Sequence, residues 1–67
     1  METKSLKMDV DKTNGVSYIY IKNNGVNKTI SLSDEGCPYL DGLAVDIVLD
    51  FDEEGKLVGL ELLGFDI

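Results

Sequence analysis

Hydrophobic and polar residues alternate with a period of two along most of the chain, which is the spacing of β-strands and not of helices. Leu6, Met8 and Val10 alternate with polar residues in this way. The segment VSYIYIK at 16–22 is rich in β-branched and aromatic side chains, which favour strands. Three more segments continue the pattern: NKTISLS at 27–33, VDIVLDF at 45–51 and KLVGLELL at 56–63. The pattern therefore predicts five strands.

Turn residues separate these five segments. Asn14-Gly15 and the NNG at 23–25 are strong turn signals, and the segment DEGCPYLDGLA at 34–44 contains two glycines and the single proline. We therefore expect loops at 11–15, 23–26, 34–44 and 52–55. The predicted fold is mainly β, an antiparallel five-stranded meander in one β-rich domain at 6–67. Residues 1–5 are polar and are expected to form a flexible N-terminus.

The stretch DFDEEGKLVGLE at 50–61 nearly fits the EF-hand calcium pattern, and only Glu54 departs from it. An EF-hand needs an amphipathic helix on each side of its loop. The entering segment alternates as a strand does, and the exiting segment LELLGFDI contains Gly64 and is too short for a helix. We therefore predict a β-hairpin here in place of a calcium loop.

Two registers can be compared for this hairpin. A three-residue loop at 53–55 would set Asp50 opposite Val58 and mix charged with apolar groups on one face. A four-residue loop at 52–55 gives one clean apolar face, so we predict that loop. Asp52 and Gly55 would shape the turn, through a carboxylate that accepts backbone N–H bonds and a left-handed conformation. The predicted pairs are Leu49–Val58, Ile47–Leu60, Val45–Leu62, Asp50–Leu57, Val48–Gly59 and Asp46–Glu61.

Apolar and aromatic residues of the predicted strands form a candidate interface: Tyr18, Tyr20, Ile47, Leu49, Val58, Leu60 and Leu62. A chain of 67 residues buries only about 60% of the surface that it exposes when unfolded. No predicted helix is long enough to cover a sheet. The apolar face of a single sheet must then be covered by curling of the sheet, by a second copy or by a different protein. We favour a homodimer.

Carboxylates of the hairpin form a candidate acidic patch: Asp46, Asp50, Asp52 and Glu61. Such a patch could bind a divalent cation weakly through Asp50, Asp52 and Glu61, or it could receive a basic protein. Its simplest interpretation is a solvated polar face. We therefore assign no metal ligand, no cofactor and no catalytic residue.

The composition narrows the classes of function. The formal net charge is −7, which argues against nucleic acid and anionic membrane as partners and allows a basic protein partner. No apolar run approaches 18 residues. The chain has no histidine to act as a base for its one cysteine, so we interpret Cys37 as a small loop residue and expect no enzyme. A single thiol and no signal peptide favour a reducing, cytoplasmic setting.

Two segments of the chain resemble a small bacterial family known as domain of unknown function 2283. The segment SYIYI at 17–21 is similar to the family's first strand motif. The matches to its second motif are Asp50, Asp52, Gly55, Val58, Gly59, Leu60, Glu61, Leu62 and Leu63. The resemblance covers roughly residues 8–63. The chain departs from the family in two ways: residues 34–44 are longer than the usual middle segment, and the chain stops at Ile67 where many members continue. It implies a small β-rich intracellular protein, and an antitoxin-like neutraliser of a basic toxin partner, because some members are encoded beside toxin-like proteins.

Overall fold

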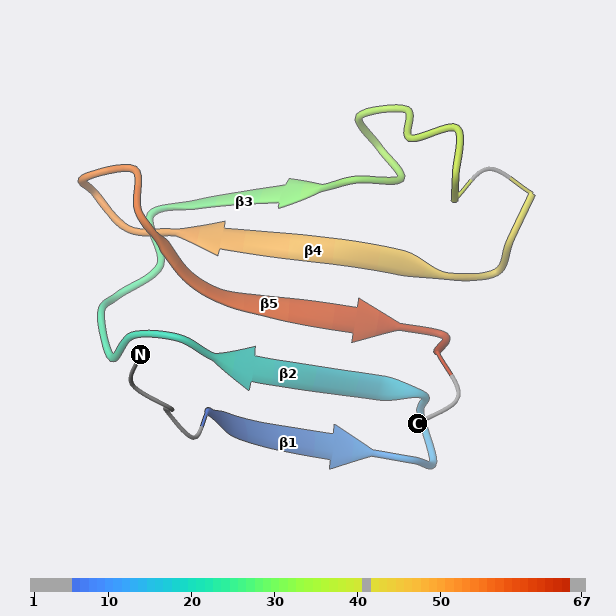
Figure 1. The fold of residues 1–67 in the computed structure, drawn as a ribbon, viewed down its shortest axis with the longest axis horizontal. Coiled ribbons are helices and arrows are strands. Elements are labelled where there is room, and N and C mark those ends of the chain that lie inside the picture. The colour runs from blue at the N-terminus through green and yellow to red at the C-terminus, as the bar shows by residue number, and fades with distance from the viewer. Residues whose placement is uncertain (1–5, 41, 66–67) are drawn as a thin grey trace, which may run out of the picture.

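The computed structural model describes residues 6–40 and 42–65, and within them the chain forms five strands and no helix (Figure 1). The strands are β1 (Lys7–Asp11), β2 (Val16–Tyr20), β3 (Lys28–Ser31), β4 (Asp46–Phe51) and β5 (Leu57–Leu63). The five predicted strands are confirmed. The flexible terminus expected at 1–5 lies outside the described residues. No helix in the described part of the chain is long and apolar enough to cross a membrane.

All five strands lie in one antiparallel sheet, as predicted, but their order is β1-β2-β5-β4-β3 (Figure 1). A meander would have placed them in sequence order, so this part of the prediction is wrong. The connection at 21–27 crosses from β2 to the far edge of the sheet, and β5 returns to the middle. There β5, the most apolar strand, has a hydrogen-bonded neighbour on both of its edges.

The β4–β5 turn is a three-residue loop, and the predicted four-residue loop is wrong. The Asp52 N–H donates to the Lys56 carbonyl at 2.9 Å, and the Gly55 N–H donates to the Asp52 carbonyl at 3.0 Å. Gly55 has a φ of 79°, which is the left-handed conformation that follows a type I turn in hairpins of this length. Its backbone conformation is thus what closes the hairpin.

The register of β4 with β5 also differs from the prediction, by two residues. Leu49 pairs with Leu60 and Asp46 with Leu63, whereas next to the turn Phe51 pairs with Leu57. The shift between Asp50 and Phe51 leaves Val58 as the extra residue of a β-bulge. With the bulge, the hairpin has a three-residue turn and still keeps its apolar residues together on one face. Neither of the two regular registers considered from the sequence combines these two features.

The paired residues divide the sheet into two faces, because cross-strand partners project to the same side. The residues of what we call the apolar face are Met8, Val10, Ser17, Ile19, Lys28, Ile30, Ile47, Leu49, Phe51, Leu57, Leu60 and Leu62. The residues of the polar face include Asp9, Asp11, Tyr18, Tyr20, Thr29, Ser31, Asp46, Val48, Asp50, Gly59 and Glu61.

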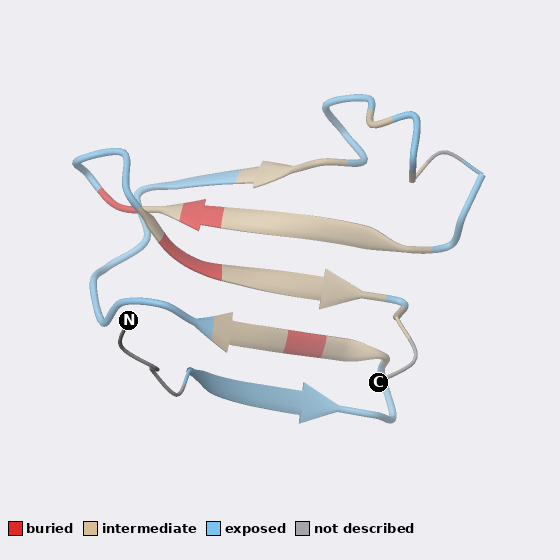
Figure 2. Ribbon diagram, in the orientation of Figure 1, coloured by how far each residue is buried: buried red, intermediate tan, exposed pale blue. Residues whose placement is uncertain are grey.

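Burial is shallow throughout the sheet (Figure 2). Among the described residues, Val58 is the one buried hydrophobic side chain, with 2% of its surface exposed. The five described strands touch only their neighbours within the sheet, so within residues 6–40 and 42–65 no second layer of strands covers either face. The described part of the chain is therefore a single open layer, whereas most domains enclose a hydrophobic core between two layers.

Candidate functional site

The four residues of the predicted acidic patch lie in two places. Asp46, Asp50 and Glu61 project from the polar face, and Asp52 lies in the β4–β5 turn. The predicted pairing of Asp46 with Glu61 is wrong, because Glu61 lies opposite Val48. Each aspartate of the set is held by hydrogen bonds within the fold, which gives it a structural role.

Asp50 is the most connected of these carboxylates. It accepts hydrogen bonds from the Tyr18 hydroxyl at 2.6 Å and from the Thr29 hydroxyl at 2.8 Å, and only 8% of its surface is exposed. The hydrogen bond to Asp50, followed by burial, raises the pKa of Tyr18 to about 12. The three side chains come from β2, β3 and β4, so the cluster ties together strands from both halves of the sheet.

Gly59 makes this cluster possible. Tyr18 lies on β2 and Asp50 on β4, so the tyrosine ring must cross β5 between them. A Cβ atom at position 59 would lie 2.7 Å from Cζ and 2.8 Å from Cε1 of Tyr18, which is too close for any side chain. The sequence carried a signal for this contact, because a glycine inside a strand often marks a close approach.

Asp46 holds the end of β3 against β4. Its carboxylate accepts from the Ser31 hydroxyl at 2.5 Å and from the Ser33 N–H at 2.9 Å. The Ser31 bond is the largest cause of the lowered pKa of Asp46, and the bond from Ser33 adds to it. This carboxylate therefore serves the connection between two strands.

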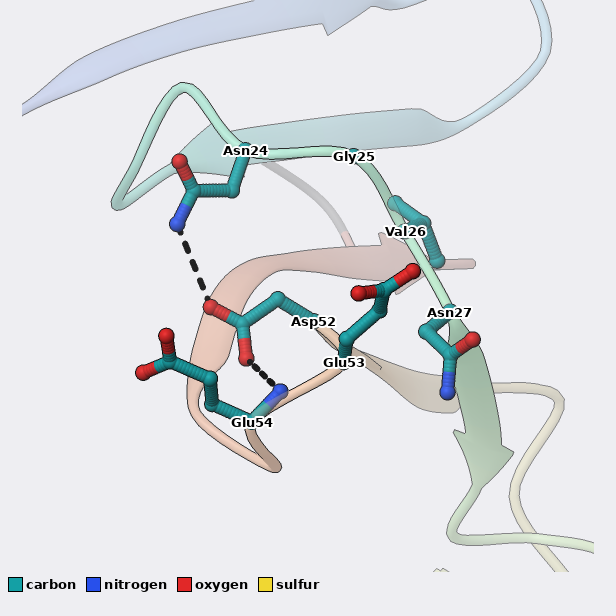
Figure 3. Close-up of a pocket in the computed structure, with 7 residues that line it drawn as sticks. All are labelled: Asn24, Gly25, Val26, Asn27, Asp52, Glu53 and Glu54. Atoms are coloured by element: carbon teal, nitrogen blue, oxygen red, sulfur yellow. Dashed lines mark hydrogen bonds between the residues drawn. The ribbon is translucent and has the colours of Figure 1, made fainter.

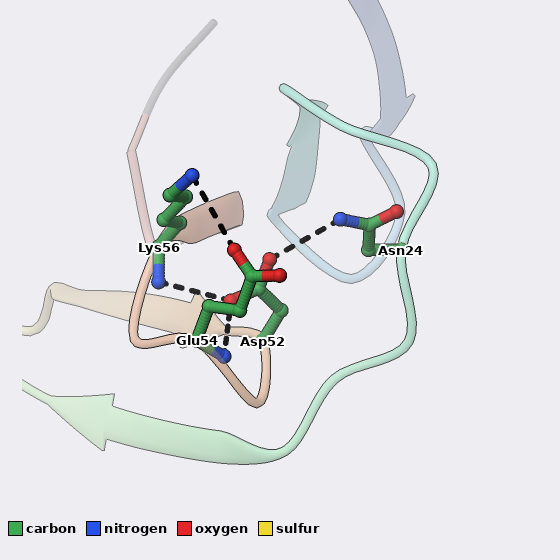
Figure 4. A network of polar contacts seen from close by, with 4 residues as sticks. All are labelled: Asn24, Asp52, Glu54 and Lys56. Atoms are coloured by element: carbon green, nitrogen blue, oxygen red, sulfur yellow. Dashed lines mark hydrogen bonds and ion pairs between the residues drawn. The ribbon is translucent and has the colours of Figure 1, made fainter.

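Asp52 organises the β4–β5 turn (Figure 4). Its Oδ1 accepts the backbone N–H groups of Glu54 at 2.9 Å and Lys56 at 3.0 Å, and its Oδ2 accepts from the Asn24 side chain at 3.2 Å. The Lys56 N–H contributes most to the lowered pKa of Asp52. The ion pair between Lys56 and Glu54, at 3.3 Å, is exposed and adds little stability.

A hollow of about 360 Å³ lies beside this turn, between it and the connection from β2 to β3 (Figure 3). The lining residues are Asn24, Gly25, Val26, Asn27, Asp52, Glu53 and Glu54. In the described part of the chain, no group of three or more His, Cys, Asp or Glu side chains could hold a metal ion. Asp50, Asp52 and Glu61, which the sequence suggested as cation ligands, do not form such a group.

The predicted interface residues separate onto different surfaces. Ile47, Leu49, Leu60 and Leu62 share the apolar face, whereas Tyr18 and Tyr20 project from the polar face. Val58 is buried at the bulge and is not available to a partner. Tyr18 packs on Tyr20 with ring centroids 4.8 Å apart, and the Tyr20 hydroxyl donates to Asp9 at 2.8 Å.

The apolar face is larger than the sequence indicated. One row of paired residues crosses all five strands and is apolar throughout: Met8, Ile19, Leu60, Leu49 and Ile30. The alternation of Met8 and Val10 was visible in the sequence, but their place beside the hairpin depends on the central position of β5. Met8 is 39% exposed and Val10 is 44% exposed, so β1 continues the uncovered surface to the edge of the sheet.

The fold and these surfaces define a class of protein, a small single-layer antiparallel sheet with one apolar and one hydrogen-bonded polar face. The family model for proteins of unknown function named DUF2283 matches residues 7–65, and the chain belongs to this family. No curated protein and no solved structure matches the chain.

Proposed function

We propose that this protein is a non-enzymatic protein-interaction module and that the apolar face of its sheet is its docking surface. The observation that carries the proposal is the continuous apolar row that runs from Met8, which is exposed, through the half-buried Leu60 to the half-buried Ile30. Contiguous exposed apolar surface marks interaction sites in folded proteins. The removal of apolar surface from water contributes about 25 cal/mol for each Å², from which the costs of association must be subtracted.

The polar face supports the same proposal, because its carboxylates are already used within the sheet. Its carboxylates at Asp46 and Asp50 accept hydrogen bonds from hydroxyl and backbone groups of the sheet itself. Cys37 is half-buried in the loop between β3 and β4, and the chain has no histidine to activate it. The polar groups thus act as structural acceptors, and the apolar face remains the surface that needs a partner.

Site-specific photo-crosslinking in cells tests the docking role. Leu49, on the apolar face, is replaced by p-benzoylphenylalanine, and the matched control replaces Val48, its neighbour on the polar face. We expect protein adducts from position 49 and few from position 48, with the adduct composition determined by mass spectrometry. Equal yields from both positions, or none from position 49, would show that the apolar face is not a docking surface.

The net charge of −7 supports a second candidate, an antitoxin-like module that neutralises a basic protein. Such a complex would depend on charge attraction, which salt screens. The dissociation constant should then rise steeply between about 0.05 M and about 0.5 M salt. An affinity that does not change with salt would argue against this mode of binding.

A further inference from the structure

We infer that the occupant of the apolar face is a second copy of this chain, stacked face to face, with a two-fold axis close to Leu60. The inference rests on the proposed docking role of that face and adds the identity and geometry of the partner. Three observations carry it: the surface area of one copy, the distribution of charge between the faces, and the position of β5.

One copy exposes too much surface for a compact monomer. Its accessible surface is 5172 Å², whereas about 4,200 Å² is expected for a compact chain of 7.4 kDa. This excess of about 1,000 Å² is similar to the ~800 Å² that each partner contributes to a standard interface. The radius of gyration agrees, at 12.9 Å against about 11 Å for a compact domain of this length. A second copy would supply the missing layer.

The charge distribution favours a second copy over a basic partner at this face. The strand carboxylates all project from the polar face: Asp9, Asp11, Asp46, Asp50 and Glu61. Lys28, on the edge strand β3, is the one charged strand residue of the apolar face. A basic protein would therefore find no strand carboxylate to pair with at the apolar face. Two copies can approach through it while their acidic groups point away from each other.

The strand order fixes where the two copies should cross. β5 has two strands on each side, so a two-fold axis over β5 gives the greatest overlap of two sheets. Leu60 is the middle residue of the apolar row, between Ile19 on β2 and Leu49 on β4. In two sheets that pack about 10 Å apart, Leu60 of one copy would contact Leu60 of the other.

Opposite charges at position 60 test this geometry. Leu60→Lys and Leu60→Asp each place like charges together across the axis, so each variant alone should associate at least about 100-fold more weakly than wild type. An equal mixture should recover the dimer mass in sedimentation, because lysine then meets aspartate. Val48→Lys, a matched change on the polar face, should stay dimeric. A mixture that remains monomeric, or a monomeric wild type at about 100 µM, overturns the inference.

A milder variant keeps the test decisive if charge at position 60 unfolds the chain. In a Cys37→Ser background, Leu60→Cys should give covalent dimers with a bismaleimide that spans about 10 Å, and Val48→Cys should not. No dimer from Cys37→Ser/Leu60→Cys overturns the inference. If photo-crosslinking from position 49 gives adducts only with a different protein, the docking role is supported and the second copy is ruled out. The two proposals can therefore fail separately.

Discussion

The two faces of this sheet differ in how their side chains are satisfied within one small chain. On the polar face, Tyr18, Thr29 and Ser31 donate to the carboxylates of Asp50 and Asp46, and the hydrogen bonds stay within the chain. On the apolar face, a row of side chains crosses five strands, and no other strand of the described chain packs over it. The polar groups of the polar face are satisfied within one copy, whereas we propose that the apolar face is covered by a partner.

This difference assigns separate roles to neighbouring residues of the same strands. Asp50 joins β2 and β3 to β4 through hydroxyl groups, so it holds the strands together without a hydrophobic core. Leu49 and Leu60, next to Asp50 and Gly59 in sequence, project from the other face, where we propose that they contribute to docking. Substitutions on the polar face should therefore change the stability of the fold, and those on the apolar face should change association.

Gly59→Ala should have a larger effect on stability than Asp50→Ala or Gly55→Ala. The new methyl group would displace the Tyr18 ring, which lies 2.7 Å from its position, and would break the hydrogen bond to Asp50. Overpacking and the lost bond together should cost about 3 kcal/mol. Urea denaturation measures the cost. In a Tyr18→Ala background the same substitution should cost much less, and an equal cost in both backgrounds would show that Tyr18 is not the reason for the glycine.

Asp50→Ala should have the second-largest effect and lower the free energy of unfolding by about 2 kcal/mol. The reason is that the hydroxyls of Tyr18 and Thr29 lose a charged acceptor. Asp50→Asn keeps an acceptor oxygen and should lose about half as much. Asp9→Ala removes an exposed partner of Tyr20 and should change the free energy of unfolding by less than about 0.5 kcal/mol. Equal losses for Asp50→Ala and Asp9→Ala would contradict the structural role of the buried carboxylate.

Gly55→Ala should cost about 1 kcal/mol, because the residue has a φ of 79°, where a side chain is strained. Gly25→Ala is the matched control, since Gly25 has open space around its Cβ position and no positive φ. Its stability should stay close to that of wild type. A Gly55→Ala variant as stable as the Gly25→Ala variant would exclude the three-residue turn.

The pH dependence of stability should report the hydrogen bond between Tyr18 and Asp50. The pKa of Tyr18 is raised from 10.0 to about 12 in the folded chain, so the bond contributes its full stability below pH 10.0. That contribution is lost as the pH rises through about 12. An ultraviolet titration should show a phenolate component near pH 12 that disappears in Tyr18→Phe. Its persistence in that variant would assign the late titration to another group.

The sequence predicted the strands well because alternation is a local property of each segment. It could not predict the order of strands, because alternation does not say which neighbour a strand pairs with. The register of β4 with β5 was wrong by two residues for a related reason. A slip of two leaves every side chain on the same face, so pairing Leu49 with Val58 or with Leu60 looks equally apolar.

The candidate site was predictable in part. The apolar residues of β4 and β5 were identified, but Tyr18 and Tyr20 were grouped with them although they lie on the other face. Asp50 was expected to be solvated and is 8% exposed, because its donors come from β2 and β3, which are distant in sequence. Contacts of this kind depend on the strand order, which local patterns do not encode.

Sedimentation equilibrium of the wild-type chain at micromolar concentration tests most directly whether the apolar face is covered by a second copy. We predict a mass of twice 7.4 kDa that falls toward 7.4 kDa only on dilution. The Leu60→Lys variant should remain at the lower mass over the same range. A wild-type chain that keeps a mass of 7.4 kDa at every concentration, while its circular dichroism spectrum remains that of a folded β-sheet, would contradict the proposed dimer.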